Sequence, residues 1–281
     1  MIDLRGVIPP LVTALDNQGL VDVVSTRRLV EHLVRGGVNG LFPLGSTGEG
    51  AQLTRAQRHT VLDTVIEANA GRVQVLAGAI ASSTNTVIEY GQDAAAAGAD
   101  ALIVTAPYYY TYTQAEIIRH FRLIREAVNL PIVAYNIPSM VKVNLEKSTI
   151  RTLAEEGTIV GLKDTSADLS ATRGLMLACR DIEGFNILTG LEWVADSALA
   201  IGAAGLVPGI GNIAPADFVA IYDAALRGDW ETAQRHQERM IRLFDICYHG
   251  AATSSYSAGA LGGFKAALVL MGILETGTMI A

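Results

Sequence analysis

Lys163 ends an apolar run that begins at Thr158 and has the composition of a buried strand. A lysine carried into the interior loses hydration, which disfavours the charged ammonium and lowers the pKa of the amine. The uncharged amine is a nucleophile that forms Schiff bases with carbonyl substrates. A lysine here can also pair with a carboxylate, and Asp164 follows it directly, so both interpretations stay open at this point. The other lysines are expected in loops or on helix surfaces: Lys142, Lys147 and Lys265.

A glycine-rich turn at 45–50 supplies a second group of polar atoms. It lacks the lysine of a phosphate-binding P-loop and the spacing of a dinucleotide fingerprint, so a nucleotide site is disfavoured. The hydroxyls of Ser46 and Thr47, with the backbone N–H groups up to Gly48, suit a small anion such as a carboxylate. The same residue types also form plain turns, and the turn alone does not decide between the two.

Tyrosines end two further apolar runs. Tyr135 is either a core residue with its hydroxyl at the rim or, beside a reacting imine, a proton shuttle. Tyr108, Tyr109 and Tyr110 are consecutive, so they cannot all face the core. We expect at least one of these rings to face a cavity or another subunit.

The elements that would position these groups alternate regularly. Short β-rich runs are separated by longer segments of helical periodicity, which is typical of parallel βα units. Eight candidate strands lie at 6–13, 40–43, 73–78, 101–105, 131–135, 159–163, 185–189 and 205–208. Their mean spacing of roughly 30 residues predicts an α/β fold, a (β/α)8 TIM barrel with its active site at the carboxyl ends of the strands.

Three helical segments follow the eighth strand, where one would close the barrel. They are predicted at 215–226, 230–249 and about 262–273, and the small residues 254–259 are predicted to connect the last two. We therefore expect one catalytic domain over 1–281, with a barrel over about 1–228 and a C-terminal three-helix appendage that occupies about 229–281.

The composition favours a small-molecule partner. Half of the 281 residues are hydrophobic and 17% are charged, so a large core is expected. The net charge is −7, and Lys and Arg form no patch of the kind that nucleic acid or an anionic membrane requires. No window has the length of a membrane span, and residues 1–6 lack the pattern of a secretory signal, so we expect a cytoplasmic protein.

Metal and disulfide chemistry are not indicated by the residue inventory. Cys179 and Cys247 both fall in expected helices and are predicted to fill the core. The five histidines fall neither at strand ends nor at the spacing of metal ligands. We expect no metal and no cofactor, with a lysine-based imine as the electron sink.

Three motifs resemble, in order and spacing, the dihydrodipicolinate synthase/N-acetylneuraminate lyase family of class I aldolases, which form Schiff bases with pyruvate. They are Gly-Ser-Thr-Gly-Glu at 45–49, Tyr-Asn-Ile-Pro at 135–138 and Gly-Leu-Lys-Asp at 161–164. The resemblance covers nearly the whole chain, including the C-terminal helices. An ordinary barrel has no reason to combine these strand ends, so the resemblance favours a catalytic Lys163 over a structural one.

The resemblance implies a role for each matched residue. Lys163 would form the imine with pyruvate, or with the pyruvate half of a longer keto acid, while Tyr135 would move protons. Tyr109 would complete the tyrosine relay, and in the family this tyrosine comes across a subunit interface. Thr47 is counted as a further catalytic residue. Members are commonly homotetramers built as dimers of dimers. The carboxylate of the keto acid would be held by Ser46, Thr47 and Gly48.

Departures from the family pattern bear on the second substrate. Dihydrodipicolinate synthases usually carry an arginine two residues after the proline of the Tyr-Asn-x-Pro motif, where it binds a carboxylate. Met140 stands here, and a thioether cannot replace a bidentate guanidinium. Lys142 replaces a family glycine, so the loop backbone is expected to differ. Sialic acid lyases have an acidic pair where this chain has Glu192 and Trp193, and a serine that the loop after Val207 lacks.

By elimination, the preferred substrate is a shorter 2-keto-3-deoxy sugar acid or related hydroxy-keto acid, cleaved reversibly to pyruvate and an aldehyde. Glu192 would bind a substrate hydroxyl, with Met140 and Val207 beside it. The alternatives are dihydrodipicolinate synthase activity with aspartate semialdehyde, and a keto-deoxy sugar acid dehydratase that uses the same imine. A non-catalytic keto-acid-binding protein is disfavoured by the joint presence of Lys163 and Tyr135.

Overall fold

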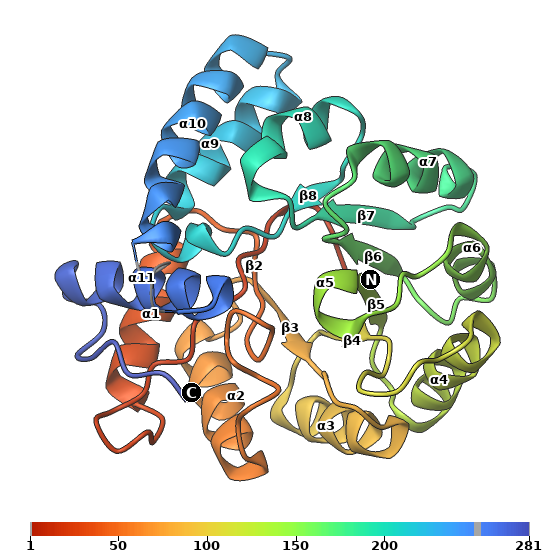
Figure 1. Ribbon diagram of the computed structural model, residues 1–281, viewed down its shortest axis with the longest axis horizontal. Coiled ribbons are helices and arrows are strands. Elements are labelled where there is room, and N and C mark those ends of the chain that lie inside the picture. Colours follow the sequence, from red (N-terminus) through yellow and green to blue (C-terminus); the bar gives the residue numbers. More distant parts are fainter. Residues whose placement is uncertain (1, 250–253, 281) are drawn as a thin grey trace.

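Eight parallel strands form a ring with helices outside it, a (β/α)8 barrel as the sequence predicted (Figure 1). The computed structural model describes residues 2–249 and 254–280, so the two ends of the predicted domain lie outside the described residues. The strands are β1 (Gly6–Val7), β2 (Gly40–Leu41), β3 (Gln74–Gly78), β4 (Ala101–Thr105), β5 (Ile132–Asn136), β6 (Gly161–Asp164), β7 (Asn186–Thr189) and β8 (Gly205–Leu206). They follow one another from β2 to β8, and β1 pairs with β8.

The ring closes between β1 and β2 through backbone that extends beyond these two short strands. The Phe42 N–H donates to the Pro9 carbonyl at 3.1 Å, and the Leu11 N–H donates to the Phe42 carbonyl at 2.9 Å. The first strand is shorter than predicted because Pro9 and Pro10 have no N–H group with which to continue a ladder.

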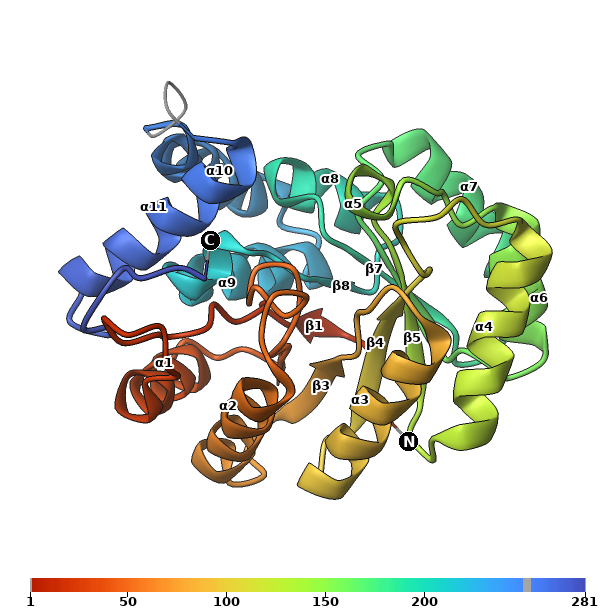
Figure 2. The same ribbon diagram turned by 60° about the horizontal axis from the view of Figure 1, so that its bottom comes forward.

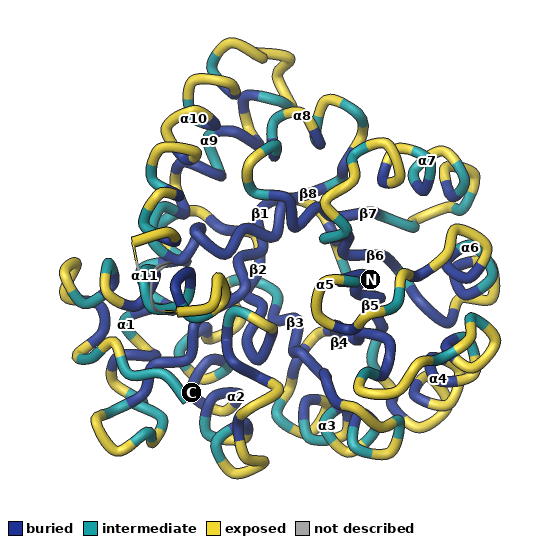
Figure 3. Tube along the Cα trace, in the orientation of Figure 1, coloured by how far each residue is buried: buried dark blue, intermediate teal, exposed yellow. Residues whose placement is uncertain are grey.

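The helices around the barrel bury one face and expose the other. Figure 3 shows buried strands around the centre and exposed residues along the outer helix faces. Thr54 and Thr113 each cap the N-terminus of one of these helices in a capping box. The helices are α1 (Val23–Arg35), α2 (Arg55–Asn69), α3 (Thr84–Ala97), α4 (Gln114–Ala127), α5 (Pro138–Val141), α6 (Lys147–Glu155), α7 (Leu169–Cys179), α8 (Ala195–Ala200) and α9 (Pro215–Leu226). Two 3₁₀ turns, η1 (Glu192–Val194) and η2 (Ile210–Asn212), follow β7 and β8.

The C-terminal segment contains α10 (Trp230–Leu243), the 3₁₀ turn η3 (Phe244–Tyr248) and α11 (Tyr256–Leu270). The last helix begins earlier than predicted, because the Ser255 hydroxyl accepts a hydrogen bond from the Ala258 N–H at 3.2 Å and caps it. The prediction of a non-helical connection was therefore wrong from Tyr256 onward. Figure 2 shows α10 and α11 on the same side of the barrel as α5, where the strands end. Within the described ranges, no helix has the length and hydrophobicity needed to span a bilayer.

Candidate active site

Lys163 and Tyr135 lie opposite each other on neighbouring strands, β6 and β5. The Lys163 side chain is buried, and its Nζ lies 3.8 Å from the centre of the Tyr135 ring and 5.1 Å from that of Phe42. The amine forms no hydrogen bond or ion pair with any residue that the structure describes. It is thus a buried, unneutralised nitrogen at a strand end, held against two aromatic faces.

Asp164 points away from Lys163, because adjacent residues of a strand face opposite sides. Its carboxylate accepts hydrogen bonds from Asn136 Nδ2 at 2.9 Å, from Ser166 Oγ at 3.0 Å and from the Thr172 hydroxyl. These contacts tie the ends of β5 and β6 to α7. The alternative in which Asp164 simply neutralises Lys163 is therefore not the arrangement found.

The turn at 45–50 presents unpaired polar atoms beside the strand ends. Its backbone is folded by the N–H groups of Gly48 and Gly50, which donate to the Gly45 carbonyl at 3.1 and 3.0 Å. The amides and hydroxyls of Ser46 and Thr47 have no partner among the described residues. Two adjacent free amides with two hydroxyls at Ser46 and Thr47 suit a carboxylate. The N–H of Gly48, which the sequence analysis also assigned to the anion, is instead used within the turn.

Glu49, the next residue of the turn, is held by the C-terminal segment. Its Oε1 accepts from Lys265 Nζ at 2.5 Å, and its Oε2 accepts from the Ile280 N–H at 2.7 Å. Both side chains of the ion pair are buried, with exposures of 0% for Lys265 and 1% for Glu49. The prediction that Lys265 lies at the surface was wrong. The missed signal is that Lys265 is the only charged residue in α11, and a helix that is apolar all round is buried.

Glu192 lies where β7 and β8 end, beside the turn at 45–50. Its Oε2 accepts from the Ile210 N–H at 2.7 Å. A Cβ built on Gly209 would lie 3.1 Å from Glu192 Oε1 and 3.5 Å from Thr47 Oγ1. The absence of a side chain at Gly209 therefore lets the Glu192 carboxyl group and the Thr47 hydroxyl lie close to the Gly209 backbone. Part of Glu192 reaches the surface, but its carboxyl group is enclosed, and this desolvation raises its pKa to about 7 against the opposing effect of the Ile210 amide.

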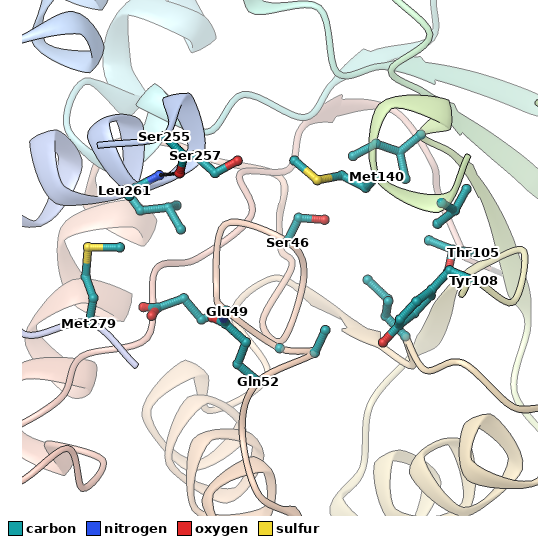
Figure 4. A pocket seen from close by; sticks show the side chains of 16 residues that line it. Ser46, Glu49, Gln52, Thr105, Tyr108, Met140, Ser255, Ser257, Leu261 and Met279 are labelled. Carbon is teal, nitrogen blue, oxygen red and sulfur yellow. Dashed lines mark hydrogen bonds between the residues drawn. The ribbon is translucent and has the colours of Figure 1, made fainter. Parts of the chain in front are cut away.

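A cavity of about 550 Å³ opens over the strand ends, with Ser46 at its centre (Figure 4). Met140 lines it as well, so the structure brings these two predicted residues together. Thr105, which the sequence did not single out, contributes a buried hydroxyl without a partner among the described residues. The other lining residues are Glu49, Gly50, Ala51, Gln52, Ile80, Tyr108, Ile137, Val141, Ser255, Ser257, Ala258, Leu261 and Met279.

Glu192 and Val207 do not line this cavity. They face a narrow space at the ends of β7 and β8 together with Thr189 and Leu191. Val207 is buried, and its N–H donates to the Thr189 carbonyl at 2.8 Å. The structure places Val207 in the core beside Glu192 and away from the large cavity.

The loop that carries Met140 keeps a backbone conformation that favours glycine. Lys142 has φ of 62° and caps the C-terminus of α5, with its N–H bonded to the Pro138 carbonyl. Lys142 Nζ donates to the Ser139 carbonyl at 2.8 Å. Lys142 thus adopts the left-handed conformation that a glycine would take at this position. Its presence does not remove the left-handed turn that was expected to change.

Tyr109 lies outside the chain's own site. Its side chain is 86% exposed, its φ is 86°, and its ring packs edge-on against that of Tyr110 at 5.1 Å. A left-handed φ is costly for a tyrosine, and such strain at an exposed aromatic pair is a feature of functional loops. Tyr108 instead turns inward to the cavity, and burial raises the pKa of its phenol.

The arrangement supplies a nucleophilic amine, a phenol beside it and an anion-binding turn, which are the parts needed for imine chemistry on a keto acid. Among the described residues, no three His, Cys, Asp or Glu side chains are placed to hold a metal ion. Catalysis by this set would depend on electron withdrawal by a protonated imine.

Comparison with known proteins gives the same family as the motifs. The family model described as "Dihydrodipicolinate synthetase family" matches residues 3–278. A 4-hydroxy-tetrahydrodipicolinate synthase of Phenylobacterium zucineum is 38% identical over 93% of this chain and 90% of its own length.

Solved structures agree over almost the whole chain. The dihydrodipicolinate synthase of Bacteroides thetaiotaomicron superposes with a TM-score of 0.93 at 34% identity, covering 99% of this chain and 92% of its own. The prophage protein YagE of Escherichia coli K12, solved in complex with pyruvate, gives a TM-score of 0.91 at 29% identity over 98% and 91%. The chain therefore belongs to the dihydrodipicolinate synthetase family of class I lyases.

Proposed function

We propose that the protein is a pyruvate-dependent aldolase in which Lys163 forms a Schiff base with a 2-keto acid. The observation that carries the proposal is the Lys163 amine, which is buried against the Tyr135 ring and has no hydrogen-bond or ion-pair partner among the described residues. The free amides of Ser46 and Thr47 lie in the turn that follows β2, at the same end of the barrel. The pyruvate carried by YagE in its solved structure is consistent with such a site.

In the cleavage direction, Lys163 Nζ attacks the C2 carbonyl of a 4-hydroxy-2-keto acid, and water leaves to form the iminium. A base removes the proton of the 4-hydroxyl, the C3–C4 bond breaks, and its electron pair forms an enamine while the aldehyde departs. Protonation at C3 and hydrolysis by water then release pyruvate and restore the amine. Tyr135 is the proposed proton carrier, because its ring contacts the Lys163 amine.

Substrate carboxylate binding is assigned to the turn at 45–50. Two amides and two hydroxyls at Ser46 and Thr47 would fix the reacting carbon beside Tyr135, and Gly48 would shape the turn through the bond from its N–H to the Gly45 carbonyl. Fixing the reacting carbon in this orientation raises the rate, because the entropy of positioning is lost on binding rather than in the reaction step. In the narrow space beside Thr47, the enclosed carboxyl of Glu192 would accept or donate a hydrogen bond to a substrate hydroxyl.

The side chain at position 140 bears on the second substrate. Curated relatives are named as synthases, yet Met140 offers no charge to the carboxylate of aspartate semialdehyde. A 2-keto-3-deoxy sugar acid, which the sequence favours by elimination, and a dehydratase acting on such an acid would both use the same imine. Release of pyruvate identifies an aldolase, whereas retention of all substrate carbons identifies a dehydratase.

We further propose that the chain acts as one catalytic domain and assembles as a homotetramer, with Tyr109 reaching the site of a neighbouring subunit. The exposure of the strained Tyr109–Tyr110 pair supports this role, because single chains rarely leave paired aromatic rings in solvent.

Exchange of the pyruvate methyl protons in D₂O tests the proposal without a second substrate. Enamine formation should make the methyl signal disappear in ¹H NMR spectra. Lys163→Arg should abolish the exchange, and Tyr135→Phe should slow it by about 10²- to 10⁴-fold. Lys147→Arg, at an exposed position on α6, is the matched control and should exchange normally. Exchange that persists in the Lys163→Arg variant would contradict the proposal.

A further inference from the structure

We infer that the aldehyde half of the substrate carries an aromatic or other hydrocarbon substituent, bound in the cavity of about 550 Å³ over the strand ends. This rests on the proposed function, since it concerns the group attached to the pyruvate half. A volume in this range holds a drug-sized or smaller ligand.

The cavity lies beside the strand ends that carry Lys163 and Tyr135, although neither of these two side chains lines it. Thr105 in its wall lies opposite Tyr135 in the sheet, and Tyr135 lies opposite Lys163. Ser46, from the turn proposed to bind the carboxylate, also lines the cavity. A substituent on the carbon bonded to C3 of the pyruvate half would therefore extend into it.

The inner walls of the cavity are apolar. Ile80, Ile137 and Val141 line it and are 5–7% exposed, so their side chains face the cavity rather than solvent. Met140 lies on one side of Ser46, and Leu261 and Met279 lie on the other (Figure 4). Thioethers on both sides suit an aromatic ring, because methionine sulfur makes favourable contacts with ring edges.

Most of the polar side chains that line the cavity lie at its exposed edge or already have hydrogen-bond partners. Gln52, Ser255 and Ser257 are exposed, and the Ser255 hydroxyl already caps α11. Thr105 Oγ1 is the buried hydroxyl in the wall that has no partner among the described residues. A polyhydroxylated chain would leave several hydroxyls unpaired against the apolar walls, and a buried hydroxyl without a hydrogen-bond partner weakens binding.

The cavity also lacks a free charge for a second carboxylate. Glu49 is the acidic residue in its lining, and Lys265 and the Ile280 N–H already occupy its two oxygens. No lysine or arginine is among the described residues that line the cavity. The walls therefore favour neither aspartate semialdehyde nor the sugar acid that elimination from the sequence gave, and they point to a different substituent on the same 4-hydroxy-2-keto acid framework.

The test compares two substrates of the same 4-hydroxy-2-keto acid framework. Pyruvate release from 4-hydroxy-2-oxo-4-phenylbutanoate and from 2-keto-3-deoxygluconate is followed with lactate dehydrogenase. The phenyl compound should show a kcat/KM at least about 10-fold higher, the size of effect expected when apolar contacts are gained and buried hydroxyls are avoided.

Met140→Arg should reduce the ratio of the two kcat/KM values, phenyl over sugar acid, by at least about 10-fold, since it puts a charge into the apolar wall. Met271→Arg is the matched control, because Met271 is 46% exposed against 50% for Met140 and does not line the cavity. The ratio of the two kcat/KM values should be unchanged in Met271→Arg. Partial unfolding of either variant does not affect this ratio, because it lowers both kcat/KM values equally.

Borohydride trapping of pyruvate separates the two levels of failure. Absence of an adduct at Lys163 would remove the proposed function itself. If the adduct forms, three results would overturn the inference about the substituent alone. They are a higher kcat/KM for the sugar acid, turnover of neither compound, and an unchanged ratio of the two kcat/KM values in Met140→Arg.

Discussion

Lys163 and Asp164 are neighbours in the chain, yet their side chains have opposite environments. The amine faces the aromatic interior without a partner among the described residues, while the carboxylate accepts three side-chain hydrogen bonds on the other side of the sheet. Strand alternation already implies this separation, so the opposite orientation of the two side chains was predictable from sequence. The surroundings of Glu192 were not, because its enclosure depends on the Gly209 backbone, which comes from a different strand end.

Glu192 should leave a measurable pH dependence of stability. Its pKa is raised from 4.5 to about 7 by desolvation, so between these values the folded protein binds more protons than the unfolded chain. The free energy of unfolding of the parent protein, relative to Glu192→Gln, should therefore fall as pH rises from about 4.5 to 7, by up to about 3 kcal/mol, and level off above.

Urea unfolding across this pH range measures the difference. Glu183→Gln, at an exposed position, controls for the loss of one negative charge. Parallel stability curves for the parent protein and Glu192→Gln would show that the carboxyl group is hydrated rather than enclosed.

At the scale of elements, the turn at 45–50 and helix α11 form one unit although more than 200 residues separate Glu49 from Lys265. The motif predicted the glycine-rich turn, and anion binding by Ser46 and Thr47 stays a proposal. Sequence reasoning assigned Lys265 to the surface because lysine usually lies there, and only the apolar composition of α11 argued against it. Local signals were sufficient for the caps of α2 and α4, whereas this contact is long-range.

Removing one partner of this buried pair should destabilise the protein strongly. Lys265→Met and Glu49→Gln should each lower the free energy of unfolding by about 3–5 kcal/mol, because each leaves a buried group without its partner. The double variant should recover more than half of the summed loss, since the buried charges are then both gone.

Chemical denaturation of the three variants gives the coupling directly. Glu231→Gln breaks the exposed ion pair with Arg235 and is the control, expected to leave stability nearly unchanged. Additive losses in the double variant would mean that Glu49 and Lys265 act independently.

At the scale of the whole molecule, the spacing of apolar runs predicted the barrel, because eight regular βα units have few other ways to bury both faces of their strands. Strand lengths were less predictable: Pro9 and Pro10 shorten β1, and the start of α11 depended on the Ser255 cap. The large cavity draws on both barrel and C-terminal segment, so its apolar character was not evident from any one motif.

Assembly should depend on the exposed tyrosine pair. The parent protein is expected to sediment as a tetramer, and Tyr109→Ala should shift it to smaller species by removing ring contacts. Tyr109→Phe should keep the tetramer but slow methyl-proton exchange, which separates packing from proton relay. Tyr248→Ala, on the C-terminal segment, is the exposed aromatic control. A monomeric parent protein would refute the assembly proposal.

The most direct test of imine chemistry is to trap it. The protein is incubated with pyruvate, reduced with borohydride, digested and analysed by peptide mass spectrometry. We predict one reduced pyruvyl adduct, on Lys163, and none on the exposed Lys142 and Lys147 or on the paired Lys265. Folded protein that yields no adduct, or an adduct that survives Lys163→Arg, would contradict the central claim that Lys163 is the nucleophile.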